Sequence, residues 1–337
     1  MNINIYEKSG YLNIAGILDL GTTYNFIVGG RGTGKTYGAL KYVITHDRKF
    51  VLMRRTQSQT DLINKPEFSP LKPVCRDLDL DISVKPITKY NSAFYRDEDT
   101  LIGYTCALST VSSARGWDAS DAVILIYDEF VPERHERAMK GEGGAFLNAY
   151  ETINRNRELE GRPPLQVLCL ANAFDIANPI FLELGLVGIA ERMQQRGQEV
   201  YINRERSITI IMPHSDKISG KKRQTALYKL TEGSTYSDMA LSNKFSYNPT
   251  DYIKAQPLKE YRPVVTVGEI TVYRHKSGRR YYVSEHRTGD PPTYHTDEVN
   301  IKRFIKAYGK RLYTAHMRGS VYFEDMLCKS LFELYLV

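Results

Sequence analysis

The sequence of 337 residues predicts an α/β protein whose mostly parallel sheet is covered by helices on both faces. Two observations carry this prediction. Short apolar runs that are typical of buried strands alternate with segments of helical spacing over residues 1–205. A glycine-rich stretch, GGRGTGKT, joins the first of these runs to a helical segment. Beyond residue 205 the pattern changes, and a small α+β domain is expected at the C-terminal end.

The expected strands of the parallel sheet are short and apolar. The first, at residues 24–28, precedes the glycine-rich stretch, and a helix with the sequence YGALKYVI follows that stretch. Residues 60–100 are polar with several Pro and Asp residues, which predicts loops and a small hairpin. A further helix is expected at residues 146–157. The other strands are expected at residues 49–53, 101–108, 122–127 and 165–171.

Charge divides the chain in the same way as the strand pattern. Residues 1–205, the predicted first domain, carry a net charge of −2, whereas residues 206–245 and 246–337 carry +4 and +5. The middle segment is predicted to be a basic linker with a loop at SDKISGKKRQ. The last segment is predicted to be a domain with antiparallel strands at residues 261–283 and helix from residue 300 onward. A basic tract favours a polyanionic partner, although a solvated surface explains the same composition.

The cysteines and the apolar runs argue against several classes of protein. None of the four cysteines is close enough to another for a CxxC pair, so neither a zinc ribbon nor a disulfide scaffold is expected. Cys169 lies in an apolar run and is predicted to be a buried thiol. No apolar run reaches the ~18 residues that a membrane-spanning helix needs, and the first residues lack the layout of a signal peptide. We therefore expect no membrane partner and an intracellular, reducing environment.

The glycine-rich stretch fits the pattern GxxxxGK[ST] in full. Its glycines let the backbone curl so that several N–H groups converge on a phosphate, and the following helix adds its positive N-terminal end. Lys35 is expected to reach the β- and γ-phosphates, and the Thr36 hydroxyl to bind Mg²⁺. The sequence therefore predicts a site for ATP and Mg²⁺. Its residues are Gly29, Gly30, Arg31, Gly32, Thr33, Gly34, Lys35 and Thr36.

Polar residues at the ends of two later strands extend this site. Asp128 follows an apolar strand as a Walker B aspartate does, and would hold Mg²⁺ through water. Glu129 lies at the carboxyl end of the same strand, where it can orient and deprotonate an attacking water. Asn172, at the tip of the next strand, can contact the γ-phosphate. The alternatives are a solvated acidic pair and a polar strand terminus. The DE pair favours a motor-type hydrolase over a kinase, and no NKxD motif of a GTPase is present.

Three arginines are candidates for an arginine finger, which neutralises the charge that develops on a transferred phosphoryl group. Arg155 and Arg157 lie two residues apart, so on a helix they face different directions. One can point toward a neighbouring subunit while the other pairs locally. Arg115 precedes the strand that ends in Asp128 and is a further candidate.

Two other groups of basic residues could contact a ligand or nucleic acid. Arg54 and Arg55 follow the second strand directly, and could contact nucleotide or DNA or pair with acids such as Asp61. The densest basic tract lies in residues 215–224, and we predict that it contacts DNA phosphates regardless of base sequence. A solvated linker is the alternative. The residues concerned are Lys217, Lys221, Lys222 and Arg223.

Several segments in a fixed order resemble one protein family. They are FIVGGRGTGKT, LMRR, LSTVSSARGWDASDAVILIYDEF, INRNRE, CLANAFDIANPIFLELGLV and LTEGSTYSDMALSNKF. Together they resemble the DNA-encapsidation ATPases of phi29-like tailed phages, small relatives of the large terminases. The resemblance covers roughly residues 20–245. Within it, the RNR run, the ANPIFLELGLV stretch and the EGSTYSDMALSN segment are more specific than the Walker motifs.

The resemblance implies a P-loop NTPase of the additional-strand, catalytic-glutamate type joined to a smaller C-terminal domain. It also implies a homomeric ring of five subunits that docks on the portal vertex of an empty procapsid in the cytoplasm of the infected bacterium and pumps double-stranded DNA inward. Carried over to this sequence, Asp128 is the Walker B aspartate, Glu129 the catalytic glutamate and Arg155 the finger that acts in trans. Arg115 stands where the family has a basic trans-acting residue.

The C-terminal domain resembles the nuclease of large terminases only weakly. Glu269, Glu285 and Asp290 are available as metal ligands, but no core strand clearly carries an Asp. We expect a degenerate RNase H-like fold that binds nucleic acid, and in some relatives this domain docks on a structural RNA at the capsid vertex. Three alternatives stay open: a terminase with an active nuclease, an ATP-gated DNA clamp that does not translocate, and a DNA translocase of the FtsK–HerA kind.

Overall fold

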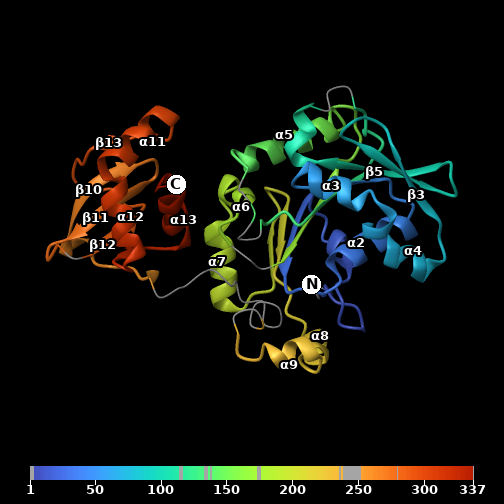
Figure 1. Cartoon of the computed structure of the whole chain (residues 1–337), viewed down its shortest axis with the longest axis horizontal. Helices are drawn as coiled ribbons and strands as arrows, with labels where there is room; N and C mark the ends of the chain where they lie inside the picture. The colour runs from blue at the N-terminus through green and yellow to red at the C-terminus, as the bar shows by residue number, and fades with distance from the viewer. Residues whose placement is uncertain are drawn as a thin grey trace. The chain divides into compact units, whose positions relative to one another are not determined.

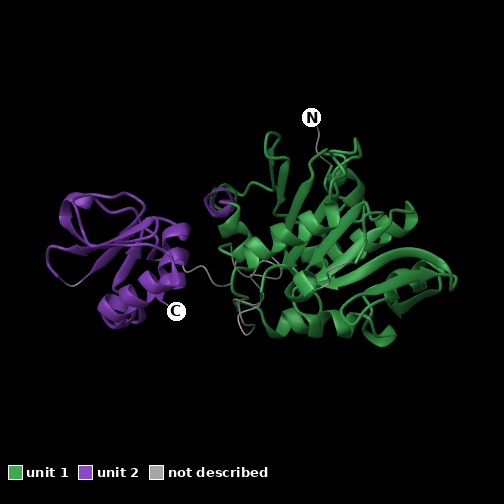
Figure 2. Cartoon of the chain, turned by 90° about the horizontal axis from the view of Figure 1, so that it is seen from above, with its two compact units in different colours: residues 1–184, 192–246 green, residues 185–191, 247–337 purple. Residues whose placement is uncertain are grey.

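The computed structural model describes residues 4–113, 117–132, 136, 139–172, 176–234, 237, 252–278 and 280–336. The chain divides into two compact units, which Figure 2 shows in different colours. Unit 1 comprises residues 1–184 and 192–246, and unit 2 comprises residues 185–191 and 247–337. The segment predicted to be a linker, residues 206–245, begins with a strand of the large sheet and therefore belongs to unit 1.

Unit 1 is built on a nine-stranded sheet, counted over the described residues, in the order β3-β4-β5-β2-β6-β7-β1-β9-β8. The inner strands from β5 to β9 run parallel. β3 and β4 at one edge and β8 at the other pair antiparallel. The strands are β1 (Tyr24–Gly29), β2 (Phe50–Arg54), β3 (Ile82–Pro86), β4 (Ser92–Arg96), β5 (Thr100–Ala107), β6 (Ile124–Asp128), β7 (Gln166–Asn172), β8 (Val200–Asn203) and β9 (Ile208–Ile211).

The strands predicted for the parallel sheet are present, each within two residues of its expected bounds. β7 lies between β1, which precedes the glycine-rich stretch, and β6, which ends in Asp128. This inserted strand agrees with the additional-strand order that the family resemblance implies. Because β1, β7 and β6 are parallel neighbours, their carboxyl ends meet at one edge of the sheet.

Helices cover both faces of this sheet, because successive side chains along a strand point to opposite faces. Along β1, Ile27 joins the apolar core that α2 covers, whereas Phe26 contacts Phe130 and Phe181 on the opposite face. Figure 1 accordingly shows α2 and α6 on opposite sides of the strands. The helices are α1 (Ile14–Leu18), α2 (Lys35–Thr45), α3 (Gln57–Ile63), α4 (Lys72–Leu78), α5 (Glu142–Asn154), α6 (Pro179–Glu183), α7 (Val187–Arg196), α8 (Asp216–Arg223) and α9 (Ala226–Leu230), with short 3₁₀ turns η1 (Pro66–Phe68) and η2 (Leu108–Ser113).

Local capping explains where helices depart from the predictions. Residues 60–100 contain helical segments besides the expected hairpin of β3 and β4, and α3 begins with a capping box formed by Thr56 and Gln59. SDKISGKKRQ forms α8 rather than a loop. The Ser215 side chain caps its first turn, and three cations fill its last turn, where they oppose the negative end of the helix dipole. The helix predicted at residues 146–157 is α5, which begins and ends earlier.

Unit 2 contains a five-stranded sheet, as far as its described residues show, in the order β13-β10-β11-β12-β14. The predicted antiparallel strands are β10, β11 and β12, while β13 and β14 join the edges in parallel. A helical stretch of α11, the π-helix η5 and α12 packs with α13 over the sheet core. The degenerate nuclease fold stays a prediction. The elements are η4 (Leu258–Glu260), β10 (Tyr261–Val267), β11 (Ile270–His275), β12 (Tyr281–Ser284), β13 (Thr293–Tyr294), α11 (Glu298–Phe304), η5 (Ile305–Gly309), α12 (Lys310–Met317), β14 (Val321–Phe323) and α13 (Met326–Leu336).

Two further sequence expectations concern the cysteines and membrane spans. All four cysteines are free thiols, and Cys169 is fully buried in β7 as predicted. Burial raises the pKa of the Cys169 thiol well above its usual range. None of the helices in the described part of the chain is both long enough and apolar enough to cross a membrane.

Candidate functional site

The glycine-rich stretch forms a tight loop, here called the glycine-rich loop (residues 29–36), between β1 and α2. Gly32 and Gly34 have φ angles of +69° and +85°, a region that favours glycine because it has no Cβ. The Lys35 ammonium is buried and donates hydrogen bonds to the carbonyl oxygens of Gly29 and Gly30 at 3.0 and 2.8 Å. The Lys35 side chain therefore connects the end of the loop to the two glycines at its start.

The strands β6 and β7 place Asp128 and Asn172 beside this loop. The Lys35 Nζ lies 3.3 Å from Oδ1 of Asn172, which pairs with Gly29 across β1 and β7. The Thr36 hydroxyl donates to Oδ1 of Asp128, at the end of β6, at 2.8 Å. The lysine and hydroxyl of the loop thus form one cluster with a carboxylate and an amide that lie about a hundred residues later in the sequence or more.

Arg54, at the end of β2, contacts both Asp128, at the end of β6, and Glu129, the next residue. Its guanidinium donates to Oδ2 of Asp128 at 2.7 Å and to the carboxylate of Glu129. Glu129 adopts a φ of +59°, which is uncommon for a residue with a side chain, and its side chain is 55% exposed. The sequence left the partner of Arg54 open. The signal that could have found it is the pairing of β2 with β6, which places the residues after both strands side by side.

Arg55 has a different role from Arg54. It is fully buried, and its Nε lies 2.6 Å from Oε1 of Glu142 while Nη1 lies 2.7 Å from Oε2 of Glu136. Glu142 is the first residue of α5, so this ion pair joins β2 to that helix. Neither nucleotide nor DNA can reach a side chain that is 1% exposed, and the suggested partner Asp61 pairs instead with Gln57.

The two arginines of the RNR run follow α5 rather than lie on it, so the helical spacing from which different directions were predicted does not apply, and both donate to carbonyl oxygens in residues 117–122. Arg157 is buried and donates to the carbonyl oxygens of Ser120 and Ala122. Arg155 donates to the carbonyl oxygen of Trp117 at 3.1 Å, and its side chain is 45% exposed. Of the two, Arg155 is therefore the one a neighbouring molecule can reach. Arg115 lies outside the described residues.

The electrostatics around the loop favour an anion. Burial lowers the pKa of the Lys35 ammonium to about 7; the charge of Asp128 opposes this shift, and those of Lys222 and Arg31 add to it. Burial followed by the charge of Arg31 also lowers the pKa of Lys222. Several cations thus lie within electrostatic reach of one another, and a bound anion would relieve their repulsion.

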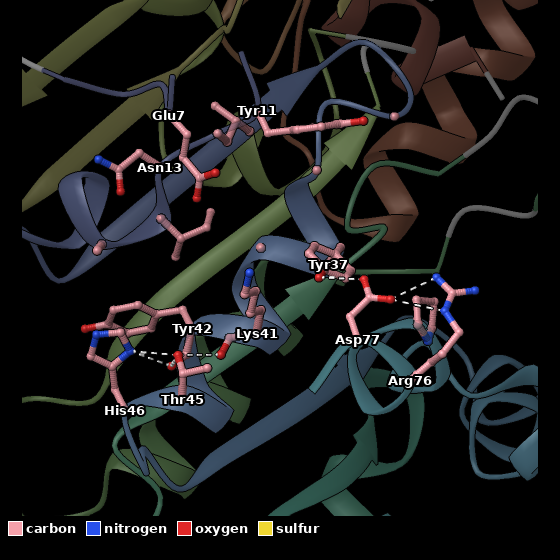
Figure 3. A pocket seen from close by; sticks show the side chains of 17 residues that line it. Glu7, Tyr11, Asn13, Tyr37, Lys41, Tyr42, Thr45, His46, Arg76 and Asp77 are labelled. Carbon is pink, nitrogen blue, oxygen red and sulfur yellow. Dashed lines mark hydrogen bonds and ion pairs between the residues drawn. The ribbon is translucent and has the colours of Figure 1, made fainter. Parts of the chain in front are cut away.

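A cavity of 660 Å³ opens beside the glycine-rich loop, and Figure 3 shows the side chains around it. Tyr11 and Asn13 approach from the N-terminal segment, while Tyr37 and Tyr42 lie on α2. The Tyr37 hydroxyl donates to Oδ2 of Asp77 at 2.9 Å. The sequence analysis did not identify these residues. The one sequence feature that points to two of them, Tyr37 and Tyr42, is that their helix directly follows the glycine-rich stretch. The cavity lining includes Glu7, Tyr11, Asn13, Gly32, Gly34, Tyr37, Lys41, Tyr42, His46, Arg76 and Asp77.

The predicted DNA-contact residues on α8 do not all share one surface. Lys217, Lys221 and Arg223 are exposed. Lys222 instead turns toward the glycine-rich loop and donates a hydrogen bond to the carbonyl oxygen of Arg31. The prediction that all four residues contact DNA phosphates is therefore revised, because the inward position of Lys222 differs from that of its neighbours.

Unit 2 contains a basic pocket that the sequence analysis missed. It measures 530 Å³ and is lined by four cations along η5, α12 and the turn that follows them, with no acidic side chain among the described residues of its lining. These residues are Lys306, Lys310, Arg311 and Arg318. The Arg311 guanidinium lies over the Tyr281 ring, 5.9 Å from the ring centroid. Four like charges around one concavity favour a polyanionic ligand.

The acids considered as metal ligands in unit 2 are Glu269, Glu285 and Asp290. Burial raises the pKa of Glu285, and the charges of Asp325, Glu324 and Glu269 raise it further. Over the described residues, no three His, Cys, Asp or Glu side chains are grouped so that they could hold a metal ion. The nuclease alternative therefore has no support from a described metal centre.

Comparison with known proteins agrees with the resemblance seen in the sequence. A model of the family described as Podovirus DNA encapsidation protein (Gp16) matches residues 6–335. The DNA packaging protein of Bacillus phage B103 is 27% identical over 335 residues, which cover 91% of this chain and 94% of that protein. The DNA packaging protein of Bacillus phage phi29 is also 27% identical, over 244 residues that cover 71% of this chain and 67% of that protein.

Solved structures share the fold along almost the whole chain. The bacteriophage Phi-29 viral genome packaging motor assembly matches with a TM-score of 0.69 and 22% identity, over 96% of this chain and 98% of that one. The Phi-28 gp11 DNA packaging motor matches with a TM-score of 0.66 and 18% identity, over 98% and 97% of the two chains. The chain therefore belongs to the Podovirus DNA encapsidation protein (Gp16) family and is a DNA packaging protein of the phi29-like kind.

Proposed function

We propose that this DNA packaging protein hydrolyses ATP at the glycine-rich loop and uses the energy to move double-stranded DNA into a procapsid. The observation that carries the proposal is the cluster formed by Lys35, Thr36, Asp128 and Asn172 around that loop. A loop with converging N–H groups, a lysine, a hydroxyl and a carboxylate is the set of groups that nucleotide-hydrolysing P-loop proteins use.

The residues around the loop fit a nucleoside triphosphate and Mg²⁺. The loop backbone and Lys35 would bind the phosphates. Thr36 and Asp128, whose oxygens lie 2.8 Å apart, would hold the Mg²⁺. An Mg²⁺ ion held there would supply positive charge to offset the charge that develops on the phosphates. The adjoining cavity, with the aromatic rings of Tyr11 and Tyr37, supplies an apolar surface for the base and ribose.

The chain's own acid–base chemistry centres on Glu129. Its carboxylate is more than half exposed at the carboxyl end of β6, so it can accept a proton from a water that attacks the terminal phosphate. The guanidinium of Arg54 already donates to this carboxylate and would compete with that water for it. We infer that the Arg54–Glu129 contact loosens before proton transfer.

We further propose that the active site is completed by a second copy of the chain in a homomeric ring. Arg155 is partly exposed just after α5, whereas Arg157 is buried and bonded within its own chain. A finger supplied by a neighbour would stabilise the transition state only when the subunits close, which allows hydrolysis to be ordered around the ring. The ring size of five, the portal vertex and a structural RNA are proposed on the family resemblance.

Nucleic-acid contacts are proposed for two surfaces. The exposed cations of α8 (Lys217, Lys221 and Arg223) form the first, and the basic pocket of unit 2 forms the second. Both can bind phosphates without reading bases, which a motor that accepts every sequence requires.

The proposal is tested by ATP hydrolysis with and without DNA and procapsids. We expect turnover that rises when both are present. Lys35→Ala should lose ATP binding, whereas Glu129→Gln should bind ATP and stall, because only water activation is removed. Lys65→Ala, which removes an exposed lysine away from the loop, is the matched control. Normal turnover in Glu129→Gln would contradict the assignment, and so would unchanged ATP binding in Lys35→Ala.

A further inference from the structure

Lys222 makes an unusual contact for a lysine on a basic surface helix. Its ammonium donates to the backbone carbonyl of Arg31 within the glycine-rich loop and lies 5.5 Å from the centroid of the Tyr228 ring. A Cβ placed on Gly32 would meet the Lys222 Cε and Nζ at 2.9 Å. The lysine side chain therefore lies directly against the loop backbone.

The partners of Lys222 do not balance its charge. The carbonyl group and the aromatic ring are neutral, and none of the ion pairs among the described residues includes Lys222. The side chain is only partly exposed, and both burial and the nearby Arg31 oppose its charged form. Among the described residues, the charge of Lys222 therefore has no opposite charge beside it, and an anion bound at the loop would supply one.

The position of Lys222 also indicates which part of a nucleotide it would contact. The Lys222 Nζ contacts the loop at Arg31 and Gly32, and its charge is close enough to act on the Lys35 ammonium. A lysine at the position of Lys35 reaches the β- and γ-phosphates. The base and ribose would lie on the other side, in the cavity lined by Tyr11 and Tyr37.

We propose that the Lys222 ammonium leaves the Arg31 carbonyl and binds the terminal phosphate of ATP, so that α8 is held against the glycine-rich loop more tightly when ATP is bound than when ADP remains. This inference rests on the proposed ATP site. It adds a phosphate ligand from outside the GxxxxGK[ST] motif. It also gives α8 two roles, because the helix carries Lys222 on one side and the exposed Lys217, Lys221 and Arg223 on others. The nucleotide state would thereby change the position of a basic surface proposed to contact DNA.

The experiment measures the affinity of the full chain for a non-hydrolysable ATP analogue and for ADP, both with Mg²⁺, by calorimetry. Lys222→Met keeps the aliphatic stem and removes the charge. Lys222→Gln keeps a hydrogen-bond donor for the Arg31 carbonyl but is also neutral. Both should weaken the ATP analogue by about tenfold or more, as expected for a lost charge-assisted hydrogen bond, and ADP by much less. Lys222→Arg should keep most of the preference, and Lys229→Met, which removes an exposed charge from α9, should behave as the parent protein.

Trypsin cleavage within α8 gives a second readout that does not depend on affinity. In the parent protein, the ATP analogue should slow this cleavage more than ADP does, because Lys222 holds the helix against the loop. At concentrations that saturate Lys222→Gln, the two nucleotides should give the same cleavage rate. A melting curve for each variant identifies any that is not folded.

The possible outcomes separate this inference from the proposed function. Loss of ATP binding in Lys35→Ala together with parental affinities in both neutral Lys222 variants would overturn the inference and leave the ATP site intact. A parental ATP preference in Lys222→Gln alone would show that Lys222 only supports the loop backbone, which also overturns it. Equal weakening of ATP and ADP would do the same. Retained ATP binding in Lys35→Ala would instead reject the proposed function.

Discussion

Arg54 forms ion pairs with both Asp128, the last residue of β6, and Glu129, the residue after it. Its guanidinium contacts a buried Asp128 and a largely exposed Glu129, so a single positive charge offsets two carboxylates. Asp128 is also the residue proposed to hold Mg²⁺ with Thr36. Arg54 and a metal ion would therefore compete for the same carboxylate, and removal of the arginine would leave a buried negative charge without its partner.

This competition predicts how Mg²⁺ affects stability. Arg54→Ala should lower the melting temperature of the protein without Mg²⁺, because Asp128 loses its charged partner. Millimolar Mg²⁺ should then raise the melting temperature of Arg54→Ala more than that of the parent protein. Arg76→Ala, which removes the exposed partner of Asp77, serves as the control. Equal Mg²⁺ stabilisation of Arg54→Ala and the parent would argue against a metal site at Asp128.

The exposed position of Arg155 leads to a prediction about two inactive variants. Arg155→Ala and Glu129→Ala should each abolish turnover, since an arginine finger contributes roughly 10³–10⁵ in rate. Mixed together, they should regain activity, because some interfaces then join an intact Glu129 to an intact Arg155 from the next subunit. ATP hydrolysis by the mixture is the measurement.

The control for this mixture replaces Arg155→Ala by Arg162→Ala, which alters an exposed arginine near the same turn and should be active alone. A mixture that stays inactive while its rings assemble would mean that Arg155 does not act between subunits. Arg115 would then be the remaining candidate, because Arg157 is buried.

At the scale of secondary-structure elements, a buried ion pair connects β2 to the start of α5. Arg55 and Glu142 are both inaccessible to solvent, and their hydrogen bonds measure 2.6 and 2.9 Å. The Tyr127 hydroxyl, which also lies against Glu142, has a pKa raised well above its usual range, first by burial and then by the charge of Glu142. The ion pair lies at the start of α5, and Arg155 follows the end of the same helix. It therefore helps to position the proposed arginine finger.

Loss of one partner in this pair should therefore be costly. Arg55→Met and Glu142→Gln should each lower the free energy of unfolding by roughly 3–5 kcal/mol, because the remaining charge or polar group stays buried. The double variant should lose less than the sum of the two. Urea denaturation of the full chain measures the effect. Glu160→Gln, which breaks an exposed pair with Arg162, should change stability by less than about 1 kcal/mol. Single variants that resemble this control would contradict the assignment.

At the scale of the whole molecule, the excess positive charge has two different structural sources. Part of it lies on α8 within unit 1, and part lines the basic pocket of unit 2. In unit 2 the helical stretch contains the π-helix η5, a form often found at functional sites. The four cations of the pocket have no acidic neighbour in its lining, so they form the strongest described candidate for a phosphate-backbone contact in that unit.

This distribution predicts the salt dependence of DNA binding. Alanine at Lys306, Lys310, Arg311 and Arg318 together should weaken DNA binding and reduce its salt slope by ~0.9 for each lost phosphate contact. The matched control replaces the exposed Lys254, Lys259, Arg262 and Lys276, which removes the same charge from unit 2 outside the pocket. If the two fourfold variants bind DNA with the same affinity and the same salt slope, the affinity depends on the net charge of unit 2 and not on the pocket. Competition by RNA separates a DNA contact from an RNA contact.

Those parts of this protein that depend on local patterns could be predicted from the sequence. Apolar runs predicted the parallel strands, because a strand buried on both faces needs apolar side chains throughout. The GxxxxGK[ST] pattern and the DE pair located the cluster of Lys35, Thr36, Asp128 and Asn172, because parallel strands end at one edge of a sheet.

Contacts between residues that are distant in the sequence could not be predicted from local patterns and are seen in the tertiary structure. Arg54 and Arg55 are adjacent in the chain, yet one contacts the proposed metal ligand and the other a buried glutamate of α5, since successive side chains at a strand end point to opposite faces. Lys221 and Lys222 look alike in the sequence, but the turn of α8 exposes the first and directs the second to the glycine-rich loop. These contacts depend on strand order and on how α8 lies against the loop, and neither is fixed by local sequence.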